Sequence, residues 1–211
     1  LLIARSAPYT PVETSAKAPM MAPGARVVYI AIALSGLTAL ASQVVWARVL
    51  ALLFGATVYT FSLILAVFLV GLGIGSSIGS SMAHNLKNPR VALGWTQMAL
   101  CVALAYAAYM STASMPFWPI NPGLSSDVMF NFQLDLMRAA FVVLPGAILW
   151  GISFPLALAS VAEKGQDPAR LVGGVYAANT VGAIVGALLA SLLAIAWIGS
   201  QHTQMVLIGI A

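Results

Sequence analysis

Long apolar stretches, separated by short segments that carry polar residues, glycine or proline, fill the sequence from Val27 onward. A helix needs about 20 apolar residues to cross the hydrocarbon of a bilayer, and the longer stretches reach that length. The pattern predicts an all-α polytopic membrane bundle of about six transmembrane helices. Five of them are complete and the sixth is cut off at the end of the chain: 27–54, 58–82, 91–110, 135–162, 170–197 and 205–211.

The first 26 residues form a separate region. They contain Pro8, Pro11, Pro19 and Pro23 among scattered polar residues, which is typical of an irregular arm. The Leu-Leu-Ile start is too short for the apolar core of a signal peptide. We therefore divide the chain into an irregular cytoplasmic N-terminal arm, 1–26, and a transmembrane helical domain, 27–211. Because the chain begins at Leu1 and stops at Ala211 inside an apolar run, we expect a fragment of a longer protein.

Two of the predicted helices carry a ridge of small residues, spaced four apart. Such a ridge lets another helix backbone approach closely in a membrane. We expect helix packing through Gly71, Gly75 and Gly79 on the second helix and through Gly174, Ala178, Gly182 and Gly186 on the fifth. The hypothesis is that both ridges are exposed and receive a second half, a second copy or another membrane subunit. Gly75→Leu and Gly182→Leu should then disrupt assembly.

The order of the helices predicts two groups of three with opposite orientation. The ridged helices hold the same place in each group, as in a 3+3 inverted repeat of a major-facilitator-type transporter half. The orientation follows from cations that precede the first, third and fifth helices: Arg5, Lys17, Arg26, Lys87, Arg90, Lys164 and Arg170. The positive-inside rule places these segments, and the N-terminus, in the cytoplasm. We expect a bacterial inner (plasma) membrane.

Composition agrees with a membrane protein and narrows the chemistry. The chain is 61% hydrophobic and 7% charged, where a soluble domain carries about 25% charged residues. The net charge of +4 is spread over several loops, so no nucleic-acid surface is expected. One cysteine, Cys101, and two separate histidines, His84 and His202, predict neither a disulfide nor a metal site. We expect no catalytic residue and no cofactor in these 211 residues.

A few polar residues inside or beside the spans are candidates for a polar cavity: Gln43, Arg48, Tyr59 and Asn179. Arg48 can either snorkel to the interface beside Trp46 or face a cavity as an inward cation. The amide of Asn179 can either join two helices or contact a substrate.

The fourth helix has its own candidate features. Pro145 and Pro155 should kink it, and broken helices are where transporters place binding sites, although plain kinks are also common in membranes. Asp135 and Arg138, three residues apart, can pair on one face of this helix.

Three segments of the chain look familiar together: QVVWAR at 43–48, FPLA at 154–157 and YAANTVGA at 176–183. With their surroundings they resemble the membrane domain of the fused, major-facilitator-like spermidine synthase-like proteins. That resemblance implies a helical bundle ahead of a cytoplasmic aminopropyltransferase-type domain, which transfers an aminopropyl group to a polyamine. The residues for that chemistry, a glycine-rich loop and clustered acids, are not in this sequence, and no catalytic residue carries over.

Three functions remain open at this stage. The first is a non-catalytic membrane domain that anchors or feeds such an enzyme. The second is a half-transporter for a small solute, whose path would use the polar candidates. The third is a structural subunit of a larger membrane complex. We favour the first, with the lipid bilayer and either a second copy or other membrane subunits as partners, and without nucleic acid.

Overall fold

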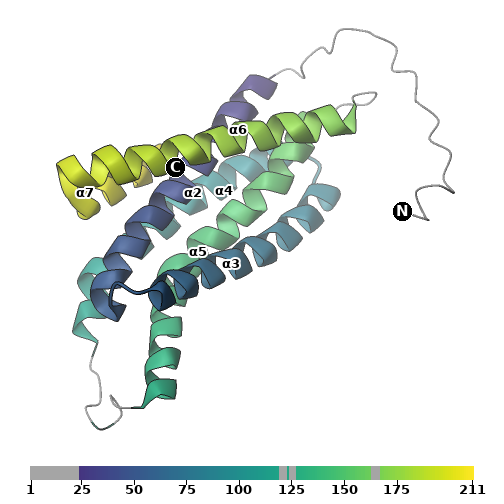
Figure 1. Cartoon of the computed structure of the whole chain (residues 1–211). Helices are drawn as coiled ribbons and strands as arrows, with labels where there is room; N and C mark the ends of the chain where they lie inside the picture. Colours follow the sequence, from purple (N-terminus) through teal and green to yellow (C-terminus); the bar gives the residue numbers. More distant parts are fainter. Residues whose placement is uncertain (1–23, 119–122, 124–126, 163–166) are drawn as a thin grey trace, which may run out of the picture.

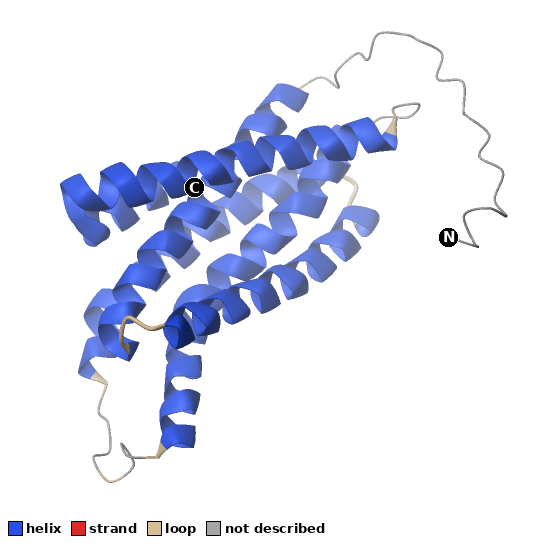
Figure 2. Cartoon of the chain, in the orientation of Figure 1, coloured by secondary structure: helices blue, strands red, loops and turns tan. Residues whose placement is uncertain are grey.

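The computed structural model describes residues 24–118, 123, 127–162 and 167–211. These residues form a bundle of long helices, and no strand occurs among them (Figure 1, Figure 2). The long helices are α2 (Ala25–Phe54), α3 (Val58–Asn85), α4 (Pro89–Tyr109), α5 (Val128–Val161), α6 (Pro168–Leu188) and α7 (Ile195–Ile210). Short π- and 3₁₀-helical turns extend them: η1 (Met110–Ser114), η2 (Met115–Phe117) and η3 (Leu189–Ala194).

Among the described residues, five helical stretches are long and apolar enough to cross a membrane. They are Ala25–Phe54, Val58–Asn85, Pro89–Phe117, Val128–Val161 and Ala169–Ile210. The all-helical fold class is therefore confirmed, and the length and composition of the helices indicate a membrane protein. The count differs from the sixfold expectation because the last stretch continues from α6 through η3 into α7.

The last stretch nevertheless changes direction inside α7. Gly199 has φ 78° and ψ 168°, a backbone conformation that is essentially restricted to glycine. After this residue the chain folds back, and Figure 1 places the C-terminus beside the middle of the bundle. The expected break between the fifth and sixth helices, 170–197 and 205–211, is thus present, but the helix after it begins directly at the bend rather than at Met205.

Helix starts follow local capping rules. Thr57 caps α3 by accepting a hydrogen bond from the backbone N–H of Thr60 at 3.4 Å, and Asp167 caps α6 through the N–H of Ala169 at 3.0 Å. Asp127 caps α5 by accepting from the N–H of Met129 at 2.8 Å. The expected start of this helix at residue 135 is therefore wrong, because Asp127 begins it two turns earlier. The first helix also begins earlier, at Ala25, while residues 1–23 of the expected arm lie outside the described residues.

The helix α5 lies in the centre of the bundle and packs against α2, α3 and α4. It stays helical through Pro145 and Pro155, and Figure 1 shows it bent rather than straight. Its Trp150 lies in the largest apolar cluster, with ring centroids 5.7 Å from Trp46 of α2 and 6.0 Å from Phe68 of α3. Aromatic rings thus join three helices at the core.

One end of the bundle gathers the start of α2, the start of α4 and the end of α5. Arg90 joins them: its Nε donates to the carbonyl of Ser160 at 2.9 Å, and its guanidinium lies near Gly24. The start of α2 and the α3–α4 connection therefore lie at the same end of the bundle.

Candidate functional site

The ridge on α3 lies directly against α5. A Cβ placed on Gly71 would lie 2.5 Å from the Cβ of Ala147, and one placed on Gly79 would lie 2.7 Å from the carbonyl oxygen of Ile152. At Gly75 the added carbon would meet the backbone of Ile148. Real Cβ atoms do not approach other atoms this closely, so the two helix backbones touch where a side chain would separate them.

The ridge on α6 packs against α2 in the same manner. Carbons placed on Gly182 and Gly186 would meet the backbone of Ala33 and Leu37. Gly174 faces the ring of Tyr29, with 3.0 Å between its added carbon and the hydroxyl oxygen. Ala178 is half-buried and packs against an apolar cluster that includes Val28 of α2 and Val175 of α6. All seven helix-packing candidates thus lie on two helix contacts within one chain.

This arrangement corrects the hypothesis that the ridges are exposed faces. The side of α3 that holds Gly75 is covered by α5, and the side of α6 that holds Gly182 is covered by α2. The reason is that a small-residue ridge accepts any helix that approaches closely, and the nearest helices belong to the same chain. Leucine at either glycine would therefore disturb the fold of one chain before it disturbed any assembly.

Two further glycines, Gly36 of α2 and Gly151 of α5, face the ridges from the opposite side. A Cβ on Gly36 would meet the backbone of Asn179, three residues before Gly182. A Cβ on Gly151 would lie 2.5 Å from the carbonyl oxygen of Leu72, three residues before Gly75. Neither glycine was expected as a contact residue, although an isolated glycine in an apolar span is a recognisable signal for such contacts.

The four candidates for a polar cavity do not come together. Gln43 is half-buried and Arg48 is exposed, both on α2, while Tyr59 stands at the start of α3. Asn179 is half-buried in the α6–α2 contact, where its side-chain oxygen lies 2.8 Å from the Cβ position of Gly36. Neither cavity described below is lined by any of them.

Tyr59 instead belongs to a polar group with two residues of α5. Its hydroxyl donates a hydrogen bond to Asp135 at 3.5 Å, and Asp135 pairs with Arg138 at 4.0 Å. The pairing expected from the i, i+3 spacing is present. The side chain of Arg138 is only 8% exposed, so most of this cation is shielded from solvent.

The core contains two interhelical hydrogen bonds that the sequence did not reveal. The indole N–H of Trp150 donates to the hydroxyl of Thr38 at 3.3 Å, and the amide of Gln97 donates to the hydroxyl of Ser153 at 3.1 Å. Each joins α5 to another helix, α2 or α4. Polar side chains that pair across helices stabilise a membrane bundle without forming a solute path.

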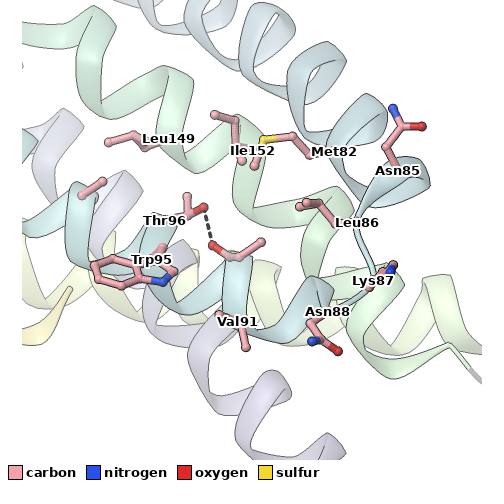
Figure 3. A pocket seen from close by; sticks show the side chains of 12 residues that line it. Met82, Asn85, Leu86, Lys87, Asn88, Val91, Trp95, Thr96, Leu149 and Ile152 are labelled. Carbon is pink, nitrogen blue, oxygen red and sulfur yellow. Dashed lines mark hydrogen bonds between the residues drawn. The ribbon is translucent and has the colours of Figure 1, made fainter.

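An open groove of about 750 Å³ lies between α3 and α4, with α5 at its base (Figure 3). Apolar side chains form most of its wall, and Lys87 is its one charged residue. The hydroxyl of Thr96 is turned to its own helix, where it donates to the carbonyl of Ala92 at 2.9 Å. The groove is therefore suited to an elongated apolar ligand rather than to a polar solute.

A smaller cavity of about 320 Å³ lies between α2, the end of α6 and α7. Its wall is apolar apart from Thr203, whose hydroxyl donates to the carbonyl of Gly199 at 2.7 Å. Within the described residues no three His, Cys, Asp or Glu side chains are grouped to hold a metal ion. Neither cavity offers paired carboxylates, a nucleophile with its base, or a phosphate-binding loop.

The length and composition of the five apolar helical stretches indicate an α-helical membrane protein, and the close backbone contacts show how its helices pack. The chain matches no protein-family model, and neither a curated protein nor a solved structure is significantly similar to it.

Proposed function

We propose that the chain is the integral membrane domain of a spermidine synthase-like protein. In this role it is non-catalytic and anchors or feeds a cytoplasmic aminopropyltransferase-like domain. The observation that supports the proposal best is where the residues of the resemblance lie. Several of them, among them Trp46, Phe154 and Gly182, take part in helix contacts, and none of the three segments lines either cavity.

Each of the three segments supplies packing residues. Trp46 of the first segment is buried against Trp150 in the largest apolar cluster. Phe154 of the second segment packs edge-on against Tyr176 of the third, with ring centroids 6.3 Å apart. The third segment also carries Gly182, which touches the backbone of α2. Segments that each supply a residue to a contact between helices are suited to a structural role.

We further propose that the six helical segments form a 3+3 inverted repeat, α2–α4 followed by α5–α7. A two-fold that exchanges the groups would turn the α3–α5 contact into the α6–α2 contact, and both are glycine contacts of the same kind. The registers also agree. Gly75 meets the residue three before Gly151, and Gly182 meets the residue three before Gly36. Inverted repeats of this kind occur in the halves of transporters. A half-transporter is therefore the second candidate function.

The proposed orientation places the end that holds Arg90 in the cytoplasm of a bacterial inner membrane. The cations at the starts of α2, α4 and α6 support this orientation. The positive-inside rule assigns the side with the excess of lysine and arginine to the cytoplasm. Other subunits would then contact the outer faces of α3 and α6. At Gly73 and Gly173 an added Cβ would meet open space, so these faces are uncovered in one chain.

The intact mass of the native protein, with peptide sequencing beyond Ala211, tests the proposal. A mass well above 21.9 kDa with a cytoplasmic strand–glycine-rich turn–helix continuation would support it. Aminopropyl transfer would then be assayed with and without the bundle. A native mass near 21.9 kDa would overturn it, since no enzyme would be attached. The half-transporter and the structural subunit would then remain, and co-purification of other chains would favour the subunit.

A further inference from the structure

We propose that the groove between α3 and α4 binds one acyl chain of an anionic phospholipid, with Lys87 against the lipid phosphate. The inference does not depend on the enzyme or transporter reading of the chain. It rests on the shape, the length and the charge of the groove.

The groove has a polar end and an apolar end. Asn85, Lys87 and Asn88 stand at the α3–α4 connection, and Figure 3 shows them together on one side. Figure 3 places Trp95 and Leu149 on the opposite side, with Val91 and Ile152 between the two ends. Ala99 also lines the groove. This is the order in which a lipid presents its headgroup and its chain.

The length of the groove corresponds to one leaflet. Along α4 it extends from Asn88 to Ala99, which is a rise of roughly 16 Å at 1.5 Å per residue. Half of the hydrocarbon thickness of a bilayer is about 15 Å. A transmembrane helix of a partner would need a groove about twice as long, so an acyl chain fits better than a helix. The volume, about 750 Å³, lies within the range of about 300–1,000 Å³ that is usual for ligand sites.

The charge favours an anionic headgroup. Lys87 is exposed, and no described carboxylate lies within ion-pair distance of it. The lining contains no acidic residue. The N-terminus of α4 at Asn88 adds a partial positive charge at the same end of the groove. The Asn88 side chain forms no capping hydrogen bond to the first turn.

The test is native mass spectrometry of the full chain in detergent, titrated with phosphatidylglycerol and, in parallel, phosphatidylcholine. The wild type should bind one phosphatidylglycerol more tightly than phosphatidylcholine. Ala99→Trp, which fills the groove, should lower the affinity for both lipids roughly tenfold, since lost contact with two methylenes already corresponds to that factor. Lys87→Gln should lower the preference for phosphatidylglycerol roughly fivefold, as expected for one cation near a membrane surface.

Two matched variants serve as controls. Ala105→Trp makes the same change at an exposed position of the same helix, outside the groove, and Arg170→Gln removes a cation from the first turn of α6. Both should bind lipid as the wild type does. Equal loss in Ala99→Trp and Ala105→Trp, or equal affinity of the wild type for the two lipids, would overturn the proposal. A dimer that dissociates in Ala99→Trp would also overturn it and would assign the groove to a second copy.

A second measurement covers the case in which Ala99→Trp fails to fold. A phosphatidylglycerol analogue with a photoreactive group in its acyl chain is cross-linked to the wild type, and the labelled peptides are sequenced. Labels at Val91, Leu149 or Ile152 would support the acyl-chain site. Labels spread over the exposed faces of α3 and α6, with none in the groove, would contradict it.

Discussion

Gly36 of α2 and Gly151 of α5 occupy equivalent positions in two separate helix contacts. Each lies against the backbone of the residue three before a ridge glycine, Asn179 before Gly182 and Leu72 before Gly75. The ridge glycines in turn contact the residues three positions before these glycines. Gly182 contacts Ala33, three before Gly36, and Gly75 contacts Ile148, three before Gly151. The two contacts therefore have the same register, and each holds two helix backbones in direct touch.

The glycine contacts predict a contrast between buried and open glycines. Gly75→Ala and Gly182→Ala should each lower the free energy of unfolding by about 1–3 kcal/mol, because the new methyl group would overlap the backbone of the facing helix. Gly73→Ala and Gly173→Ala, one on each of the same helices, meet open space and should be neutral or stabilising by up to about 1 kcal/mol. Denaturant unfolding in detergent micelles, followed by circular dichroism, measures all four. Equal destabilisation of all four variants would contradict the contacts.

The hydrogen bond between Trp150 and Thr38 predicts a penalty for removing the acceptor. Thr38→Val keeps the shape of the side chain but leaves the buried indole N–H without its partner, which should cost about 1–3 kcal/mol. Thr38→Ser retains the hydroxyl and should cost less. The tryptophan emission spectrum and the unfolding midpoint of both variants provide the comparison. Valine and serine variants of equal stability would show that the hydrogen bond contributes nothing.

The pair of Asp135 and Arg138 predicts a rescue by a second substitution. Asp135→Asn leaves the nearly buried guanidinium without a counter-charge and should destabilise by about 1–3 kcal/mol, the range for a buried donor that loses its partner. Adding Arg138→Met removes the unpaired cation and should restore most of that loss.

Asp127→Asn is the matched control for this pair, because asparagine also caps a helix N-terminus and the variant should remain near wild-type stability. The unfolding midpoints of the single, double and control variants are compared. A double variant no more stable than Asp135→Asn would argue against the pair.

The bend at Gly199 predicts a strain penalty for any side chain there. Gly199→Ala must hold φ near 78°, which should cost about 1–3 kcal/mol or straighten the chain between α6 and α7. Gly209→Ala, in the helical part of α7 with open space around it, is the control and should not destabilise. The distance between spin labels at Ala183 and Met205, measured by electron paramagnetic resonance, reports the bend. An unchanged distance together with unchanged stability in Gly199→Ala would show that glycine is not required.

The sequence by itself determined the class of the protein and most helix positions. Long apolar runs in a chain with 7% charged residues must satisfy their backbone groups internally in a bilayer, and helices do so within one segment. The ridges at Gly75 and Gly182 were visible because their spacing depends only on the period of one helix. The start of α5 was missed because Asp127 acts as a cap, a local effect that an apolar pattern does not contain.

Only the tertiary structure decided which surfaces the ridges meet. A row of small residues accepts many partners, so the choice of α5 for α3 and of α2 for α6 depends on chain connections and on the shapes of all helices together. The hydrogen bond between Trp150 and Thr38, which are 112 residues apart in the chain, also depends on how the helices pack. So does the groove at Lys87, which exists only between three packed helices. Periodicity within one helix is a local property, whereas complementarity between helices is not.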